Sequence, residues 1–504
     1  MPRRNLYAVA LVALVWVLCR QATQAAKPKD EMMEMYGLFV DAVEQVETNY
    51  VRPVSRRELL ESALNGMLHN LDPHSSFINT SEWKQFRRQI EGRFGGIGIQ
   101  VGFDPDFSRL KVMAPMVGTP AYDAGILAGD IILEIDGQTT EGMTIEKAIE
   151  VLQGGPGTPV KLTVLHEGSN SPETLTMNRA IIDVPSVLGD HRKPDDHWDF
   201  MLDRDKKIGY IRISSFIQNT TQELKAALDE LKQEGMKGLV LDLRDDPGGL
   251  LSAAVEVSDL FLEDGKIVST KGRNSPERIF SAHKDGTYTD FPMVVMVNES
   301  TASAAEIVSA ALQDHKRAAI VGQRSFGKGS VQNILDLEDG KSVLKLTIAT
   351  YWRPSGKNIH RFKNAKESDE WGVSPDKGLE VKLTPKEHLE WALARQRRDM
   401  VAFGKKKPDA AAESPKKEAE SKKDGPKKNT DQTSAQPATD KKADDKKADE
   451  QKAQDKKADA SKEKKLVNPV RDHSPKPFKD LVLEKAVSVL NGKMTEAASA
   501  AKAK

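Results

Sequence analysis

A group of serine and threonine residues lies in the segment Asn298–Glu306, where a predicted strand ends and a predicted helix begins. A serine at such a junction exposes its Oγ beside helix N–H groups that have no partner, and their partial positive charge favours an oxyanion. This arrangement suits a nucleophilic serine. The alternative is that the hydroxyl groups only cap the helix.

A lysine follows in the stretch Ser325–Gln332, where Lys328 lies between two glycines and beside an aromatic residue. A solvated lysine has a pKa of about 10.4 and is a poor base at neutral pH, whereas a desolvated lysine can be neutral and accept a serine proton. Gln332 lies four residues later, on the same strand face as Ser330, where it could orient the amine. The alternative is a salt-bridged lysine in a surface loop.

Other chemistries fit the sequence less well. Residues 322–328 match the pattern GxxxxGK of a phosphate-binding loop, but Gly329 stands where a hydroxyl for magnesium is needed, and a strand is expected to follow. The histidines occur without a GxSxG elbow or an HExxH zinc motif. The single cysteine, Cys19, excludes an intrachain disulfide and a cysteine-based metal cluster. We therefore expect no metal and no cofactor.

A second group of functional residues is the glycine-rich stretch Phe94–Ile99. Glycines before a strand let successive backbone N–H groups converge on an anion, and a peptide carboxylate suits such a nest. A tight turn would explain the glycines equally well. The candidate peptide-binding residues are Gly95, Gly96, Ile97, Gly98 and Ile99.

The hydrophobic pattern predicts the elements that position these residues. Strands and helices alternate from Lys207 to Val321, which is typical of a largely parallel sheet flanked by helices. Short strands broken by glycine predict a β-rich domain between Phe94 and Ile182, interrupted by one helix, Ile145–Leu152. Helical spacing between Met32 and Met67 predicts two helices, and Phe478–Leu490 is an amphipathic segment that should dock on the body of the protein.

Two sequence signatures resemble known families. The segments Gly118–Ala121 and Ala124–Gly137 closely resemble the core signature of PDZ domains, in which a peptide C-terminus pairs with a sheet edge. Together with Leu71–Ser76, Leu241–Gly249, Thr301–Glu306 and Phe326–Gly329, they occur in the order found in C-terminal processing (tail-specific, carboxy-terminal) serine proteases. The resemblance covers about 32–383 and the last helix.

The resemblance implies a Ser–Lys endopeptidase. Its fold would be an α/β crotonase-like (ClpP/crotonase-type) core with an inserted β-rich PDZ domain and a helical N-terminal segment. By motif position, Ser303 would be the nucleophile, Lys328 the general base and Gln332 the residue that orients the lysine. The Ala304 N–H and a glycine N–H from Gly248 or Gly249 would form the oxyanion hole.

The sequence departs from the family pattern at two positions close to the proposed site. Asp246 precedes Pro247 where the family usually has asparagine, and Ala305 stands where a serine is usual. A carboxylate near an oxyanion hole would oppose the negative charge unless it points away. Neither change affects the proposed dyad.

Composition limits the remaining functions. Lys plus Arg and Asp plus Glu each number 75, so no net field attracts nucleic acid. Residues 405–465 contain no Leu, Val, Ile or aromatic residue and are expected to be disordered. Arg3 and Arg4 precede an apolar run from Leu6 to Cys19, which predicts a signal peptide or, alternatively, an uncleaved membrane anchor.

The leading hypothesis is an exported endopeptidase, periplasmic or in the cell envelope, which recognises free apolar C-termini of protein or peptide substrates through its PDZ domain and cleaves C-terminal regions. The alternative is a catalytically silent PDZ adaptor that holds C-terminal tails. Self-association stays open. The expected parts are 1–26 (signal peptide or anchor), 27–90 (helical segment), 91–182 (PDZ domain), 183–402 (peptidase core), 403–465 (disordered tract) and 466–504 (C-terminal helical segment).

Overall fold

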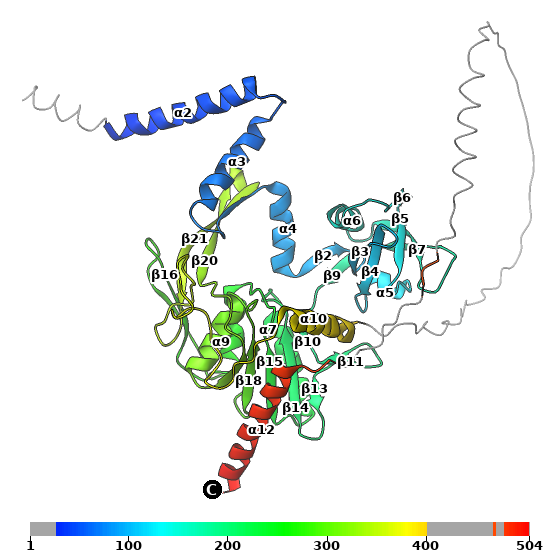
Figure 1. Ribbon diagram of the computed structural model, residues 1–504, viewed down its shortest axis with the longest axis vertical. Helices are drawn as coiled ribbons and strands as arrows, with labels where there is room; N and C mark the ends of the chain where they lie inside the picture. Colours follow the sequence, from blue (N-terminus) through cyan, green and yellow to red (C-terminus); the bar gives the residue numbers. More distant parts are fainter. Residues whose placement is uncertain (1–26, 401–466, 470–477, 503–504) are drawn as a thin grey trace, which may run out of the picture. The chain divides into compact units, whose positions relative to one another are not determined.

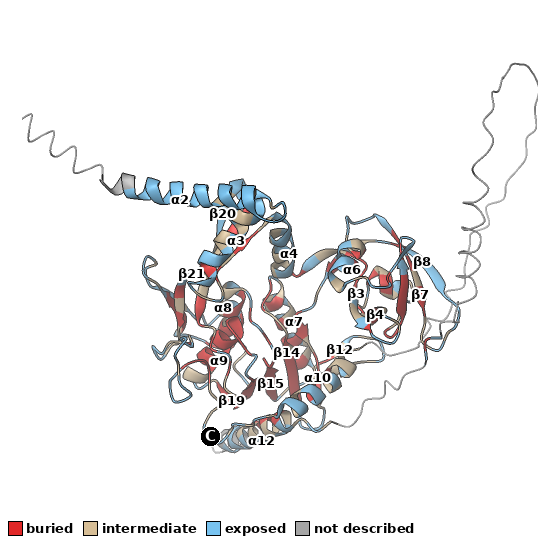
Figure 2. Cartoon of the chain, turned by 45° about the horizontal axis from the view of Figure 1, so that its top comes forward, coloured by how far each residue is buried: buried red, intermediate tan, exposed pale blue. Residues whose placement is uncertain are grey.

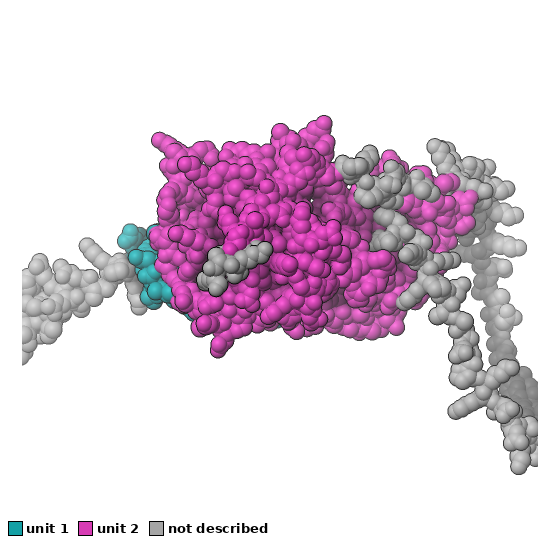
Figure 3. Space-filling model, turned by 90° about the horizontal axis from the view of Figure 1, so that it is seen from below, with its two compact units in different colours: residues 1–87, 269–279, 329–352 teal, residues 88–268, 280–328, 353–504 magenta. Residues whose placement is uncertain are grey.

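The computed structural model describes residues 27–400, 467–469 and 478–502. The expected signal segment 1–26 and the expected disordered tract 403–465 lie outside the described residues. Two compact units make up the chain, coloured separately in Figure 3. The first comprises residues up to Arg87, Ser269–Ile279 and Gly329–Trp352; the second comprises the rest.

The first unit combines N-terminal helices with an antiparallel sheet built from distant segments. Its sheet has the strand order β1–β21–β16–β17, and β20 pairs with β21 in a long hairpin. Several large apolar residues of α2 are exposed, among them Leu38 and Val40. The elements are α2 (Lys27–Asn49), α3 (Arg56–His69), β1 (Ser76–Ile78), α4 (Thr80–Glu91), β16 (Lys266–Lys271), β17 (Arg278–Ser281), β20 (Ser330–Leu337), η1 (Glu338–Gly340) and β21 (Ser342–Trp352).

The β-rich part of the second unit is a small sheet closed by two helices. The strand order is β3–β4–β5–β7–β8, so β3 lies at an edge, and β2 pairs separately with β9. Alternating side chains of these strands form one core with α5 and α6. The elements are β2 (Arg93–Gly96), β3 (Ile99–Asp104), β4 (Arg109–Pro115), α5 (Pro120–Asp123), β5 (Ile131–Ile135), β6 (Gln138–Thr139), α6 (Ile145–Leu152), β7 (Pro159–Leu165), β8 (Glu173–Asn178) and β9 (Ala180–Asp183).

The remainder of the second unit is a layered α/β fold (Figure 1). Strands β14, β15, β18 and β19 are parallel neighbours, with β10 and β13 pairing antiparallel to β14. The elements are β10 (Val187–Leu188), β11 (His191–Arg192), β12 (Trp198–Asp199), β13 (Met201–Asp203), β14 (Ile208–Ile213), α7 (Thr220–Gln233), β15 (Gly238–Asp242), α8 (Leu251–Asp259), β18 (Met293–Val297), α9 (Ala304–Asp314), β19 (Ala318–Gly322), α10 (Pro385–Asp399) and α12 (Leu481–Lys502).

Burial explains this layering. Every residue of β15, β18 and β19 is buried, as expected for parallel strands covered on both faces (Figure 2). Val482, Ala486 and Leu490 of α12 pack on one face of the sheet. Helix α9 contacts β19 and α8, and its residues from Ala304 to Leu312 are all buried. The nucleophile candidate therefore lies at the start of a helix that is fully packed in the core.

Most of the predicted elements form with small shifts. The predicted helix Ile145–Leu152 is confirmed as α6, and the two predicted N-terminal helices are confirmed as α2 and α3. In the predicted β-rich domain, strand β3 begins at Ile99, after Gly98 turns the chain with a positive φ of 78°. The C-terminal helix begins later than predicted and buries Val482, whereas Leu481 is exposed.

Candidate active site

Ser303 occupies a strained position at the start of α9. Strand β18 ends at Val297, and the chain reaches the helix through a short loop. Ser303 has φ 56° and ψ −113°, a conformation that a residue with a side chain rarely adopts and that typically costs about 1–3 kcal/mol. Such strain persists only where the surrounding structure imposes it. Ser303 is also buried, so its hydroxyl group lies in a protected environment.

Glu306, one turn into α9, holds this strained loop. Its Oε2 accepts the Ser303 N–H at 2.8 Å, which is the carboxylate half of a capping box. The same oxygen accepts the Lys328 N–H at 2.8 Å. The two backbone nitrogens therefore lie within 5.6 Å of each other, twice 2.8 Å. One carboxylate oxygen thus fixes the backbone spacing of Ser303 and Lys328.

The other oxygen of Glu306 binds the segment that leads to the lysine. Oε1 accepts the Ser325 hydroxyl at 2.5 Å and the Gly327 N–H at 2.6 Å. All four contacts are donors to the carboxylate, so the geometry is that of the ionised form. Burial nevertheless raises the pKa of Glu306 to about 7, against the lowering effect of these hydrogen bonds.

A direct backbone contact also joins the serine loop to the lysine segment. The Phe326 N–H donates to the Thr301 carbonyl oxygen at 2.9 Å. Gly327 has a φ of 85°, and a Cβ there would lie 2.8 Å from the Arg361 Cβ and 2.9 Å from a Trp371 ring atom. Glycine is therefore required before Lys328 by both conformation and space.

The glycine loop after β15 packs directly against the serine. A Cβ added to Gly248 would lie 2.7 Å from the Ser303 Cβ and 2.7 Å from the Ala304 nitrogen. The Ala302 N–H donates to the Asp246 carbonyl oxygen at 2.9 Å. The structure thus brings together three of the predicted site residues, Ser303, Ala304 and Gly248.

The two glycines of this loop differ in their hydrogen bonds. The Gly248 N–H donates to Oδ1 of Asp246 at 2.8 Å, so this predicted oxyanion donor is already engaged. The Gly249 N–H has no acceptor among the described residues. Gly249 approaches Phe216 so closely that a Cβ would lie 2.0 Å from the Phe216 oxygen. Of the two glycines, Gly249 is the one with an available N–H group.

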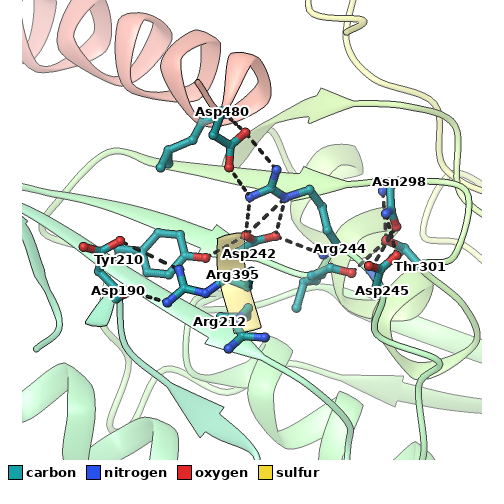
Figure 4. A network of polar contacts seen from close by, with 12 residues as sticks. Asp190, Tyr210, Arg212, Asp242, Arg244, Asp245, Asn298, Thr301, Arg395 and Asp480 are labelled. Atoms are coloured by element: carbon teal, nitrogen blue, oxygen red, sulfur yellow. Dashed lines mark hydrogen bonds and ion pairs between the residues drawn. The ribbon is translucent and has the colours of Figure 1, made fainter. Parts of the chain in front are cut away.

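A buried ionic network supports the loop from the other side (Figure 4). Arg244 binds Asp242 through Nε and Nη2, and its Nη1 and Nη2 bind the two oxygens of Asp480 at 3.0 and 2.9 Å. Tyr210 donates its hydroxyl to Asp242 at 2.7 Å. Burial raises the pKa of Asp242, but the Arg244 charge and hydrogen bonds outweigh it and lower the pKa below its usual value. The network ties the site to the N-terminal end of α12.

A second network joins the glycine loop to the serine loop. The Asp245 N–H donates to Asn298 Oδ1 at 2.9 Å, and Asn298 Nδ2 donates to Asp245 Oδ1 at 2.7 Å. Thr301 Oγ1 donates to the Leu243 carbonyl oxygen at 2.7 Å. His388 of α10 lies 3.1 Å from Asp245 Oδ2. These reciprocal contacts fix the relative position of the two loops.

Gln332 belongs to the first unit, on β20. Its Nε2 donates to Ser330 Oγ at 2.7 Å and to Thr347 Oγ1 at 3.2 Å. The predicted proximity of Gln332 and Ser330 on one strand face is therefore confirmed. Its predicted role in orienting Lys328 stays a prediction.

The predicted peptide-binding stretch lines an apolar cleft in the β-rich domain. The cleft has a volume of about 330 Å³ and lies between the glycine loop with β3 and helix α6. Gly96, Ile97, Gly98 and Ile99 line it, whereas Gly95 pairs with Ile181 in the β2–β9 ribbon. Because β3 is an edge strand, its outer side is open to pairing with an extended peptide.

Two further observations concern the described ranges only. Within residues 27–400, 467–469 and 478–502, no cluster of three or more histidine, cysteine, aspartate or glutamate side chains could hold a metal ion. No helix in the same ranges has the length and apolar character needed to cross a bilayer.

Comparisons with known proteins give two family matches and several similar proteins. Residues 207–377 match peptidase family S41, and residues 111–165 match the PDZ domain. The chain is 40% identical over 353 residues to a carboxy-terminal-processing protease of Bartonella bacilliformis, covering 69% of this chain and 76% of that protein. It is 35% identical over 335 residues to a carboxyl-terminal-processing protease of Synechocystis sp., covering 66% of this chain and 74% of that protein. Among solved structures, a photosystem II D1 C-terminal processing protease is 31% identical, with 68% of this chain and 92% of that chain covered and a TM-score of 0.39.

These matches define the chain as a serine-type peptidase with a PDZ domain. It belongs to the carboxy-terminal processing proteases of peptidase family S41.

The sequence by itself assigns no role to Glu306 or Asp480. The capping-box spacing of Ser303 and Glu306 was a usable signal for the first, although it predicts only the bond to Ser303. Nothing local indicates that Asp480 binds Arg244, which lies 236 residues earlier.

Proposed function

We propose that this chain is an exported endopeptidase of the Ser–Lys type that cleaves the C-terminal regions of proteins. The observation that carries the proposal is the pair of bonds from one oxygen of Glu306 to the Ser303 and Lys328 N–H groups, each 2.8 Å long. A nucleophile and a base must be held at a fixed spacing, and this carboxylate supplies that constraint.

In the proposed reaction, Ser303 Oγ attacks the carbonyl carbon of the scissile peptide bond. The neutral Lys328 amine accepts the hydroxyl proton and then gives it to the leaving amine, which leaves an acyl-enzyme ester. A water molecule, deprotonated by the same amine, hydrolyses the ester and regenerates Ser303. The negative oxygen formed in each step would be stabilised by the Ala304 N–H and by Gly249, whose N–H is the available one in the glycine loop.

Substrate selection is assigned to the apolar cleft of the PDZ domain. Its lining is glycine-rich at one end and aliphatic along β3 and α6, which suits a free carboxylate followed by an apolar side chain. Protein or peptide tails with free apolar C-termini are therefore the proposed substrates. We also assign Gln332 to orienting the lysine and the α/β core to the crotonase-like class.

Export and self-association complete the proposal. The charged and apolar order of the first 19 residues supports a cell-envelope location, with either a cleaved signal or an anchor. The exposed apolar residues of α2, including Tyr36, Leu38 and Phe39, support contact with a second copy of the chain. Sedimentation of the purified protein with and without residues 27–50 tests the second point.

The deciding experiment incubates the purified protein with an unfolded substrate that bears an apolar C-terminus. We expect cleavage by the native chain and none by Ser303→Ala or Lys328→Ala, with unchanged far-UV circular dichroism. Cleavage by either variant at the native rate would refute the dyad. Binding of the substrate tail without cleavage by the native chain would favour the silent adaptor instead.

A further inference from the structure

Asp246 is a buried acid beside the proposed oxyanion site, and its two oxygens have different environments. Oδ1 accepts the Gly248 N–H at 2.8 Å. Oδ2 is buried and has no hydrogen-bond partner. The side chain is completely buried, and a buried carboxylate normally needs a cation or several donors. One N–H donor leaves the negative charge of an ionised Asp246 largely uncompensated.

Four charged groups on the surrounding elements are bonded to other partners. They are Arg244, bound to Asp242 and Asp480; Asp245 and Glu299, both facing His388; and Glu306, bound to four donors, one of them the Lys328 backbone N–H. Only burial and the Gly248 N–H act on the pKa of Asp246. Burial accordingly raises the pKa of Asp246 well above its usual value, and the Gly248 N–H only partly opposes this effect. The geometry of Asp246 and the direction of its pKa shift both favour the neutral acid over the ionised form.

A neutral aspartic acid has nearly the shape and polarity of asparagine. Both present one carbonyl oxygen as acceptor and one group that can donate, and neither carries charge. The asparagine usual at this position in the family is therefore imitated by Asp246 while its carboxyl is protonated. Ionisation ends the resemblance of Asp246 to asparagine. It also places a negative charge next to a loop that must stabilise the negative oxygen formed during the reaction.

We propose that Asp246 is a positioning residue that works in its neutral form, holding the Gly248 N–H through one oxygen, and that ionisation of this single carboxyl as pH rises switches off peptide-bond cleavage. The switch rests on the proposed function, because it acts through the oxyanion loop. The contacts that transmit it are those of Gly248 with Ser303 and Ala304.

The test compares the full chain with Asp246→Asn across pH 6–10, measuring kcat on the tail-bearing substrate. The asparagine cannot ionise, so the ratio of the variant kcat to the native kcat should rise with pH, approaching about tenfold per pH unit above the ionisation. Asp245→Asn is the matched control, because it removes the neighbouring carboxylate of the same loop, which is partly exposed and paired with His388. Its kcat ratio should not rise with pH in the same way.

A stability measurement separates this inference from the proposed function. Because the pKa of Asp246 is higher in the folded than in the unfolded protein, its proton stabilises the fold. This stabilisation is complete below the unfolded pKa of about 3.9 and is lost as pH rises through the native pKa. The Tm of Asp246→Asn minus that of the native chain should therefore increase by about 3 °C per pH unit in that window. A kcat ratio that stays constant across pH 6–10 would overturn the switch, and a constant Tm difference would overturn the neutral acid. If the native chain cleaves nothing but the Tm difference still rises, the proposed function fails and the neutral acid stands.

Discussion

Replacement of Glu306 by glutamine tests how the dyad is held. The two side chains have the same size, but one carboxylate oxygen becomes an NH₂ group that donates. The Ser325 hydroxyl can rotate to accept from this group, so the amide nitrogen should take the Oε1 position. The amide oxygen then keeps the Ser303 and Lys328 bonds, and only the Gly327 N–H faces a donor.

The expected loss of stability follows from the Gly327 N–H, which loses its acceptor. A buried N–H without an acceptor costs about 1–3 kcal/mol, so we expect the free energy of unfolding to fall by about 2 kcal/mol. The Tm should drop by about 4–8 °C. Because Gly327 precedes Lys328 directly, its displacement moves the base, and a shift of about 1 Å can cost 10²-fold in rate. We expect kcat to fall about 10- to 100-fold with little change in KM.

The assay pairs steady-state cleavage with thermal unfolding, and Asp314→Asn is the control. Asp314 is at the other end of the same helix, where it binds Arg353 at 2.6 Å. Its variant should lose stability without losing kcat. Native-like kcat in Glu306→Gln would refute the positioning role, and equal losses of kcat in both variants would show that only helix stability matters.

Three further predictions concern Glu306, Asp480 and the apolar cleft of the PDZ domain. Cleavage by the native chain should rise between pH 5 and 7 as Glu306 ionises. The stability that results from the raised pKa of Glu306 is complete below about pH 4.5 and is lost by about pH 7. Glu306→Gln should show neither change in the pH profiles of kcat and Tm. Asp480→Asn should lower the unfolding free energy by about 1–3 kcal/mol because the buried Arg244 loses one of its two carboxylate partners. Glu484→Gln, at an exposed ion pair, should change it by less than about 0.5 kcal/mol in the same thermal unfolding measurement. Amidation of an apolar substrate tail should weaken binding to the full chain at least tenfold by fluorescence polarisation, and equal affinity for free and amidated tails would remove the carboxylate nest from the proposed function.

Much of the fold follows from local pattern. Helix α6 begins and ends where its spacing predicts, and β15, β18 and β19 follow from short runs of buried aliphatic residues. These elements are encoded by neighbouring residues, whose periodicity and propensity do not depend on distant partners. The serine before α9 and the lysine between two glycines could be chosen as candidates for the same reason.

The tertiary structure alone decided how those candidates are held. Glu306 is a helix-capping residue by its sequence, but packing places the Lys328 backbone, 22 residues later, on the same oxygen. Gly248 is a predicted oxyanion donor by its sequence, but the orientation of Asp246 engages its N–H. Asp480 reaches Arg244 only because α12 docks across the sheet. Hydrogen-bond partners and burial depend on which surfaces meet in three dimensions, and local sequence does not determine them.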